Sequence, residues 1–271
     1  MNLTYATYHT PENTAITNSK VRDFLRSKEF YKAKHIDRTV PDSMTPSMML
    51  GSVVDCVFNG FALGDEFTRE KGDGSGKPYV QPAVWSKGIE IGEFLTRQGF
   101  FRWYDGKRCD VQVPLWTGVT HNGQSFTIAS LPDRLTYHKG TVYVDDLKTT
   151  RNSDIETPER WYWKCVRSGY FRQFGAMAEC VAQKFPEATG AVFRHIAVGT
   201  TKEGTWPVKL YTVPLPLVAV GASEFMDAAA LITAEREWND PPIVWESAVD
   251  LGTVKASCLE DDEDEDGFIE A

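Results

Sequence analysis

Two extended runs joined by a tight turn occupy the middle of the chain. Residues 127–137 form the first run, 138–140 (His-Lys-Gly) the turn, and 141–149 the second run. Glycine readily adopts the positive φ that a short loop between antiparallel strands requires, so this stretch predicts a β-hairpin. Because side chains alternate along a strand, four residues of the second run share one face: Val142, Val144, Asp146 and Lys148. This face is unusual for a strand that only fills a core, since it carries an acid and a base.

The acid and the lysine of this strand are two residues apart, which the rise of a strand sets at roughly 7 Å. Asp133 belongs to the first run and lies within reach of both, whereas Asp145 points to the opposite face. Two acids and a lysine that meet at a strand end can hold a divalent cation and a water molecule beside it. The alternative is an exposed ion pair between Asp146 and Lys148, which is common and contributes little stability.

A further acid lies in a helix that we expect to begin at Thr45-Pro46, where a capping residue precedes proline. The helix would run to about Asn59, with Asp55 flanked by apolar residues on both sides. Gly51 lies one turn earlier on the same face and permits the close approach of another backbone. An acid in apolar surroundings is paired, protonated or bound to a metal. The alternative is an amphipathic helix that exposes Asp55 to solvent.

The net charge of −9 is unusual for a protein that binds nucleic acid. Of the 38 acids, eight lie between residues 260 and 270, so the rest of the chain holds 30 acids and 29 bases. A nearly neutral body is compatible with a local basic groove. We expect residues 259–271 to be a disordered acidic tail, because so charged a segment cannot bury enough apolar surface to fold. A solubilising tail is the simpler account, and Phe268 and Ile269 within it leave open docking on a partner, or competition with nucleic acid for a groove of this protein.

Several classes of protein are disfavoured. The five cysteines are odd in number and none are close in sequence, which argues against a disulfide framework and against a zinc or iron–sulfur site built on CxxC spacing. No stretch approaches the apolar length of a membrane span, and the N-terminus lacks the basic and apolar regions of a signal peptide. We therefore expect a cytoplasmic protein with no membrane partner.

The remaining elements are predicted from local signals. Residues 16–38 form short helices capped by Asn18 or Ser19 and by Ser27, and their many basic residues either meet phosphates or form a solvated face. Residues 68–79 are a glycine-rich loop, and 83–100 are helical with interruptions. From residue 107 we predict a three-stranded meander ending in the hairpin. Later elements are helices at 157–168, 170–184 and 217–238 and strands at 191–198 and 206–213.

Three segments of the chain resemble one family. The pattern P-D-R-L-x(10)-D-L-K-T-T, which begins at Pro132, is similar to the signature of PD-(D/E)xK nucleases, and within them it resembles the RecE (exonuclease VIII) branch. The segments TPSMMLGSVVD and YFRQ resemble the same branch, and the resemblance covers roughly residues 10–240. It implies an α/β fold with a restriction-endonuclease-like mixed sheet flanked by helices. It also implies a single nuclease domain at 1–250, with a helical N-terminal part at 1–60 and a catalytic core at 107–240.

The resemblance also implies a function. The chain would be a Mg²⁺-dependent DNA exonuclease (Mn²⁺ also being suitable) that acts 5′ to 3′ on linear duplex ends in recombination or end processing. Asp133, Asp146 and Lys148 would be catalytic, and the metal ligands would be Asp55, Asp133, Asp146 and the Leu147 carbonyl. Residues that bind DNA or brace the site would be Tyr170, Gln173, Thr149 and Arg172. Relatives carry a histidine at the position of Asp55 and a glutamate near Gln112.

The same resemblance is compatible with a single-strand annealing or recombination partner and with a homo-oligomer. Two other functions stay open. One is a catalytically weak DNA-binding protein accessory to recombination, and the other is a structure-specific endonuclease on the same fold.

Overall fold

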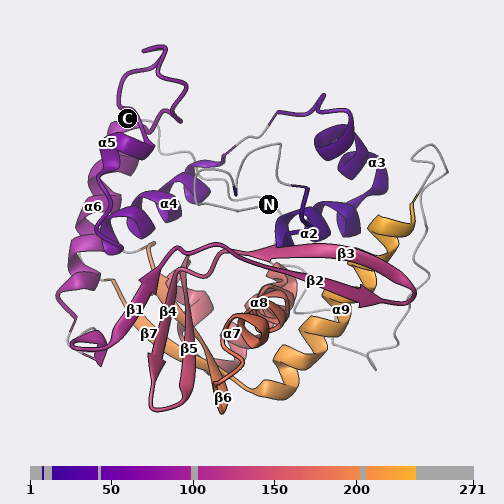
Figure 1. The fold of residues 1–271 in the computed structure, drawn as a ribbon. Coiled ribbons are helices and arrows are strands. Elements are labelled where there is room, and N and C mark those ends of the chain that lie inside the picture. Colours follow the sequence, from indigo (N-terminus) through magenta and orange to yellow (C-terminus); the bar gives the residue numbers. More distant parts are fainter. Residues whose placement is uncertain (1–7, 9–13, 42–43, 99–102, 202–205, 236–271) are drawn as a thin grey trace, which may run out of the picture. The chain divides into compact units, whose positions relative to one another are not determined.

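The computed structural model describes residues 8, 14–41, 44–98, 103–201 and 206–235 (Figure 1). By its contacts the chain separates into two units, Met1–Asn239 and Asp240–Ala271, and every described residue belongs to the first. The predicted acidic tail at 259–271 therefore lies outside the described residues.

A five-stranded mixed sheet forms the centre of the first unit. Its strands, in spatial order, are β1 (Arg108–Val111), β4 (Arg134–His138), β5 (Thr141–Thr150), β6 (Gly190–Gly199) and β7 (Val208–Val213). Strands β5 and β6 pair in parallel, and every other neighbouring pair is antiparallel. The connection between the two parallel strands holds the helices α7 (Pro158–Ser168) and α8 (Tyr170–Lys184), as a parallel crossover requires.

The predicted hairpin is confirmed as β4 and β5. Lys139 and Gly140 both have positive φ, at 50° and 79°, as a two-residue turn between twisted strands requires. The predicted first run, however, is two strands, because Pro132 interrupts it. Its earlier part is β3 (Gln124–Ser130), which pairs with β2 (Leu115–His121) in a separate two-stranded sheet.

The prediction of a three-stranded meander is therefore wrong. Strand β1 pairs with β4 of the central sheet rather than continuing into β2. Two features separate β1 from β2: Gln112 has a φ of 46°, and Pro114 has no backbone N–H to donate to a ladder.

Helices cover both faces of the central sheet (Figure 1). On one face, α4 (Pro46–Phe58) and α6 (Pro82–Thr96) pack on the odd-numbered β5 residue Leu147 and on Ile196 of β6. On the other face, α8 and α9 (Leu215–Ala234) pack on the even-numbered residues Val142 and Val144. The expected class, an α/β fold with a mixed sheet flanked by helices, is confirmed.

Helix α6 is continuous, contrary to the prediction of an interrupted helix. Gly88 and Gly92 lie within it because a Cβ at these positions would be 2.4 Å and 2.6 Å from the side chains of Val53 and Val57 of α4. The glycines thus permit close packing of two helices rather than breaking one of them.

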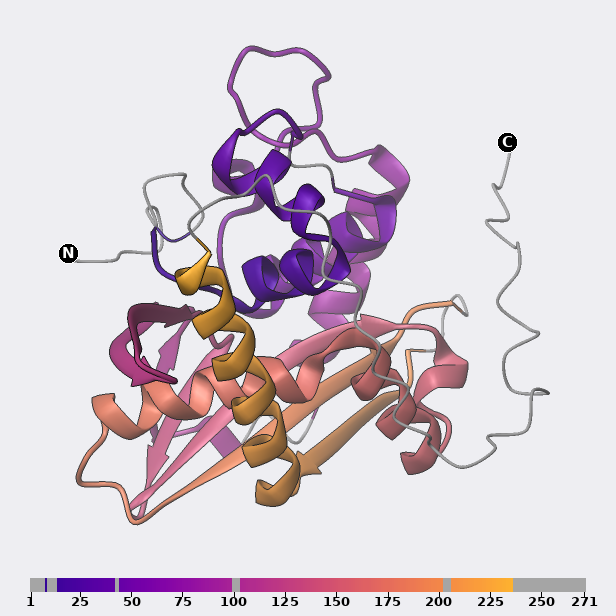
Figure 2. The ribbon, with the colours of Figure 1, turned by 90° about the vertical axis from the view of Figure 1, so that its right-hand side faces the viewer.

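Helix α9 crosses α8 at very short range (Figure 2). A Cβ on Gly175 would lie 2.2 Å from the Ala222 nitrogen, and one on Gly221 would lie 2.1 Å from the Phe171 oxygen. Our expectation that no segment has the apolar length of a membrane span is wrong for α9, which meets that criterion by length and composition. A helix of a protein core meets the same criterion, and Phe225 of α9 is fully buried in this packing.

The N-terminal part is helical, as predicted, with α2 (Asn18–Arg26), α3 (Lys28–Tyr31), a π-helical turn η1 (Lys32–Ile36), α4 and α5 (Leu63–Glu66). Ser27 caps α3 as expected, but Thr17 rather than Asn18 or Ser19 caps α2. The basic side chains here also serve the fold. Lys28 is buried and pairs with Glu235 at 2.7 Å, and Lys34 pairs with Asp23 at 3.1 Å.

Candidate active site

Asp146 and Lys148 lie on one face of β5, as the alternation of side chains predicts. The Lys148 ammonium forms an ion pair with Asp146 Oδ2, and Gln173 Nε2 of α8 donates to Asp146 Oδ1 at 2.9 Å. The alternative of an exposed ion pair is excluded, because the side chains of Asp146 and Lys148 are only 2% and 16% exposed. The pair is therefore buried against Gln173 of α8.

Asp133 reaches the same strand from the turn that precedes β4. Its Oδ2 accepts a hydrogen bond from the backbone N–H of Leu147 at 2.5 Å, and its carbonyl accepts one from Gln112 N at 3.0 Å. The hairpin therefore brings this carboxylate beside the residue that separates Asp146 from Lys148.

Asp55 belongs to α4, which packs on the face of the central sheet opposite to α8. Its Oδ1 accepts from Asn59 Nδ2 at 2.7 Å, and its Oδ2 accepts from the side-chain amide of Gln112. The Gln112 Oε1 is buried and has no hydrogen-bond partner within the described part of the chain. Gln112 thus joins Asp55, through its side chain, to Asp133, through its backbone.

Burial and the charge of a neighbouring carboxylate raise the pKa of each of the three acids. Burial is the largest cause for each, and repulsion from Asp146 helps to raise the pKa of Asp55 to about 7. The pKa of Asp133 is raised well above its ordinary value by burial and by the charges of Asp55 and Asp146. Burial also raises the pKa of Asp146, although Lys148 opposes this. Three acids therefore share one electrostatic environment in which Lys148 provides only part of the compensating charge.

Lys148 is held in its charged form by the same group. Burial by itself would lower its pKa, but the Asp146 carboxylate, with smaller contributions from Tyr170 and Asp133, outweighs burial and raises it. The ammonium also lies 4.9 Å from the centre of the Tyr170 ring, at cation–π distance.

The donor atoms of this group suit a hard cation. Carboxylate and amide oxygens are the ligands that Mg²⁺ and Mn²⁺ prefer, and the unpartnered Gln112 Oε1 adds a neutral oxygen beside the acids. Across the residues that the structure describes, no three acidic, histidine or cysteine side chains are spaced as ligands of one metal. The ligand set Asp55, Asp133, Asp146 and Leu147 therefore stays a prediction.

Of the four residues expected to bind DNA or to brace the site, two contact Asp146 or Lys148 and two lie against other helices. Tyr170 and Gln173 flank Lys148 and Asp146, as described above. Thr149 faces α4, since a Cβ on Gly51 would lie 2.9 Å from its Oγ1. Arg172 contacts α2, where its Nε donates to Asn18 Oδ1 at 3.2 Å.

Asp145 points away from this group, as expected. It is fully buried and accepts two hydrogen bonds from Arg194 of β6, at 2.6 and 2.7 Å. The Tyr104 hydroxyl donates to it at 2.7 Å. These contacts assign Asp145 to the core of the opposite face.

Sequence reasoning missed two residues of the site. These are Asn59 and Arg134. Asn59 donates to Asp55 and accepts from Arg134 Nε at 3.0 Å, so the two residues fix the position of the Asp55 carboxylate. The spacing of four residues between Asp55 and Asn59 is a helical signal for the first contact. No local signal exists for the second, because Arg134 lies 75 residues later in the chain.

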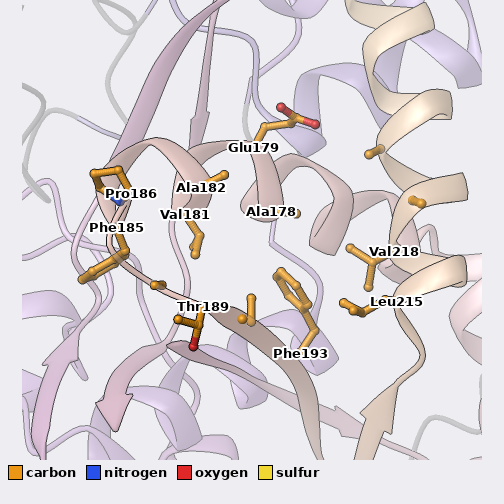
Figure 3. Close-up of a pocket in the computed structure, with 15 residues that line it drawn as sticks. Ala178, Glu179, Val181, Ala182, Phe185, Pro186, Thr189, Phe193, Leu215 and Val218 are labelled. Atoms are coloured by element: carbon orange, nitrogen blue, oxygen red, sulfur yellow. The ribbon is translucent and has the colours of Figure 1, made fainter. Parts of the chain in front are cut away.

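A cavity of about 630 Å³ lies elsewhere, between α8, α9 and the start of β6 (Figure 3). Apolar side chains such as Val181, Phe193 and Val218 line it. None of the acids of the candidate site does, so this cavity is separate from the chemistry described above.

Comparisons with known proteins bear on the fold. No family model matches the chain, and no curated protein matches it in sequence. The crystal structure of SSO0001 covers 81% of this chain and 85% of its own at 13% identity, and its TM-score of 0.31 is too low to support an argument. The crystal structure of a protein named "Putative exonuclease", from Eubacterium rectale, covers 89% of each chain at 20% identity, with a TM-score of 0.60. This chain therefore shares its fold with that protein.

Proposed function

We propose that this protein is a divalent-cation-dependent nuclease that hydrolyses phosphodiester bonds of DNA. The observation that carries the proposal is the buried Asp146–Lys148 pair with the Asp133 carboxylate bound one residue away, at the Leu147 N–H. The name of the protein from Eubacterium rectale that shares the fold supports the same reaction class.

Residues of both α4 and the hairpin would hold the cation. These are Asp55, Asp133, Asp146 and the Leu147 carbonyl, with Gln112 Oε1 as a neutral oxygen beside them. A bound Mg²⁺ or Mn²⁺ would polarise the phosphate and lower the pKa of a water molecule. Aspartate at position 55, in place of the histidine of RecE-type relatives, adds negative charge and favours a hard cation.

Lys148 would act as a cation beside the phosphate. Because Asp146 stabilises its protonated form, Lys148 is suited to orient the attacking water and to offset the charge that develops on the phosphate oxygens. This arrangement favours those two roles over proton abstraction. Gln173 would position Asp146, and the Tyr170 ring would restrict where the Lys148 ammonium can lie.

We propose that the substrate is linear duplex DNA, attacked from its ends, 5′ to 3′, with a 5′-phosphate on the product. The protein would then serve in recombination or in end processing, with a single-strand annealing or recombination protein as its partner. A homo-oligomer is compatible with this role.

The test compares linear duplex with covalently closed circular DNA, each incubated with the purified protein in MgCl₂ or in EDTA. We expect digestion of the linear DNA only, and only with Mg²⁺. Asp133→Ala, Asp146→Ala and Lys148→Ala should each lower the rate by about a thousandfold or more. Asp227→Asn, at an acid that is 55% exposed and pairs with His121, is the matched control and should digest normally.

Three outcomes would contradict parts of this proposal. A triple variant of Asp133, Asp146 and Lys148 that is as active as the wild type would exclude the assigned site. Cleavage of the closed circle would replace the exonuclease by an endonuclease, and DNA binding in EDTA without any cleavage in Mg²⁺ would indicate an accessory protein.

A further inference from the structure

Helix α7 exposes aromatic and basic side chains together. Its buried side holds Trp161 and Cys165. Its exposed side carries a stripe at positions i, i+3, i+4 and i+7, which a helix places on one face: Arg160, Trp163, Lys164 and Arg167. Trp163 is 43% exposed, an unusual setting for the largest apolar side chain. We call these four residues the α7 stripe.

The Trp163 ring is held in place from one side. Tyr162 contacts it edge-on, with ring centroids 5.2 Å apart, and Tyr162 in turn packs on Phe171 of α8 at 5.6 Å. An exposed ring supported in this way loses little conformational entropy when a flat ligand stacks on it.

Basic residues follow the acids at the start of α7. Glu156 and Glu159 precede Arg160, and from Arg160 to Ala178 the sequence holds four basic residues and no acid. Within the stripe, Arg160 pairs with Glu156 and is 56% exposed, and Lys164 lies 3.6 Å from Asp154 and is 30% exposed. The Arg160 pair is exposed on both sides and therefore weak, so a phosphate can compete for this guanidinium. Lys164 is more sheltered, because its partner Asp154 is only 18% exposed. The stripe therefore differs from the N-terminal basic segment, where Lys28 is buried in an ion pair.

The α7 stripe lies close to the candidate active site. Trp161, on the buried side of the same helix, is 6.0 Å from the ring of Tyr170, which contacts Lys148. Asp154 accepts a hydrogen bond from Thr150 at the end of β5 and also pairs with Lys164. Trp161 and Tyr170 therefore lie between the α7 helix and Lys148, with the stripe on the far face of that helix.

We propose that the α7 stripe binds single-stranded DNA next to the candidate active site. Trp163 stacks on an unpaired base, and Arg160, Lys164 and Arg167 contact the flanking phosphates. A single strand is the preferred ligand because a ring can stack only on a base face that duplex neighbours do not cover. The inference rests on the proposed function, because that function identifies the nucleic acid as DNA. Helix α7 would then bind the single strand that enters or leaves the candidate active site.

The first experiment measures the affinity of the full-length protein for a labelled oligothymidine by fluorescence anisotropy, in EDTA so that no hydrolysis occurs. Trp163→Ala should weaken binding by about tenfold, the usual effect of removing one stacked base. Trp163→Phe keeps a stacking face and should bind nearly as the wild type does. Trp116→Ala is the matched control, because Trp116 is also exposed, at 40%, but lies on β2.

The second experiment tests the cations. Replacing Arg160, Lys164 and Arg167 together by glutamine should reduce the slope of log affinity against log salt concentration by about 2, or roughly 0.7 for each phosphate contact on a single strand. An oligonucleotide of the same length without bases should bind the wild type and Trp163→Ala equally, since it offers phosphates but nothing to stack.

Specific outcomes overturn the inference. They are equal affinity of Trp163→Ala and wild type for oligothymidine with unchanged circular dichroism, an equal loss in Trp116→Ala, and a salt slope that the triple substitution leaves unchanged. Because these measurements are made in EDTA, they stand apart from the nuclease assay. If the protein digests linear DNA but gives any of these results, only the assignment of the α7 stripe is wrong. If it binds DNA through the stripe but never cleaves, only the proposed function is wrong.

Discussion

The backbone N–H of Leu147 donates to Asp133 Oδ2 at 2.5 Å, and this bond joins the turn before β4 to the strand that carries Asp146 and Lys148. It holds a carboxylate in place although the neighbouring acids repel it. Clustered carboxylates lower the stability of the folded protein unless a cation binds between them. Such a loss of stability is common where side chains are arranged for function.

Asp133→Asn separates the charge from the hydrogen bond, because the amide oxygen can still accept from Leu147. A carboxyl whose folded pKa is raised contributes stability that is complete below its unfolded pKa, near 4, and is lost as the pH rises through the folded value. The wild type should therefore lose this stability as the pH rises above about 4 in EDTA, whereas the variant should not. We expect the free energy of unfolding of the variant to be higher by about 1 kcal/mol in urea denaturation.

Added Mg²⁺ should reverse that order. A ligand at about 100 times its Kd stabilises the folded state by about 2.7 kcal/mol, and Asp133→Asn should gain much less because a charged ligand is missing. The same denaturation in MgCl₂ and in EDTA measures both effects. An equal gain in the two proteins would remove Asp133 from the ligand set.

Gly221→Ala should destabilise the crossing of α8 and α9. The added methyl group would lie 2.1 Å from the Phe171 oxygen, which belongs to backbone and cannot rotate away. We expect a loss of about 3 kcal/mol in the free energy of unfolding, at the upper end of the usual effect of overpacking. Gly118→Ala, at an exposed glycine of β2 with nothing within 4 Å, should change it little. Similar values for the two variants would contradict this crossing.

Acid should weaken the N-terminal helices through Asp23. Burial would raise the pKa of this carboxyl, but hydrogen bonds from His35 and Lys34 outweigh burial and lower it to about 2. A depressed pKa gives stability that is present above the unfolded value of 3.8 and lost as the pH falls toward 2. We expect a loss of about 2 kcal/mol over this range.

Thermal melting across that pH range measures the loss. Asp23→Asn should flatten it, and Asp37→Asn, at an acid that is 44% exposed beside Lys32, should retain it. A wild-type profile that Asp23→Asn leaves unchanged would show that other carboxyls dominate the acid response.

Local chemistry in the sequence determined where most elements begin and turn. The Thr-Pro pairs at 45–46 and 157–158 start α4 and α7, and Lys139-Gly140 makes the hairpin turn. Each of these signals acts within a few residues, so it needs no knowledge of the rest of the fold. The shared face of Asp146 and Lys148 follows likewise from the two-residue period of a strand.

Only the tertiary structure decided which of these pieces meet. The pairing of β1 with β4, the contact of Gln112 with Asp55, and the attachment of Arg172 to Asn18 all join residues far apart in sequence. The same holds for the burial that changes Asp146 and Lys148 from a surface pair into the centre of a candidate site. Partner choice and burial depend on how whole helices and sheets pack, and no short window of sequence contains that information.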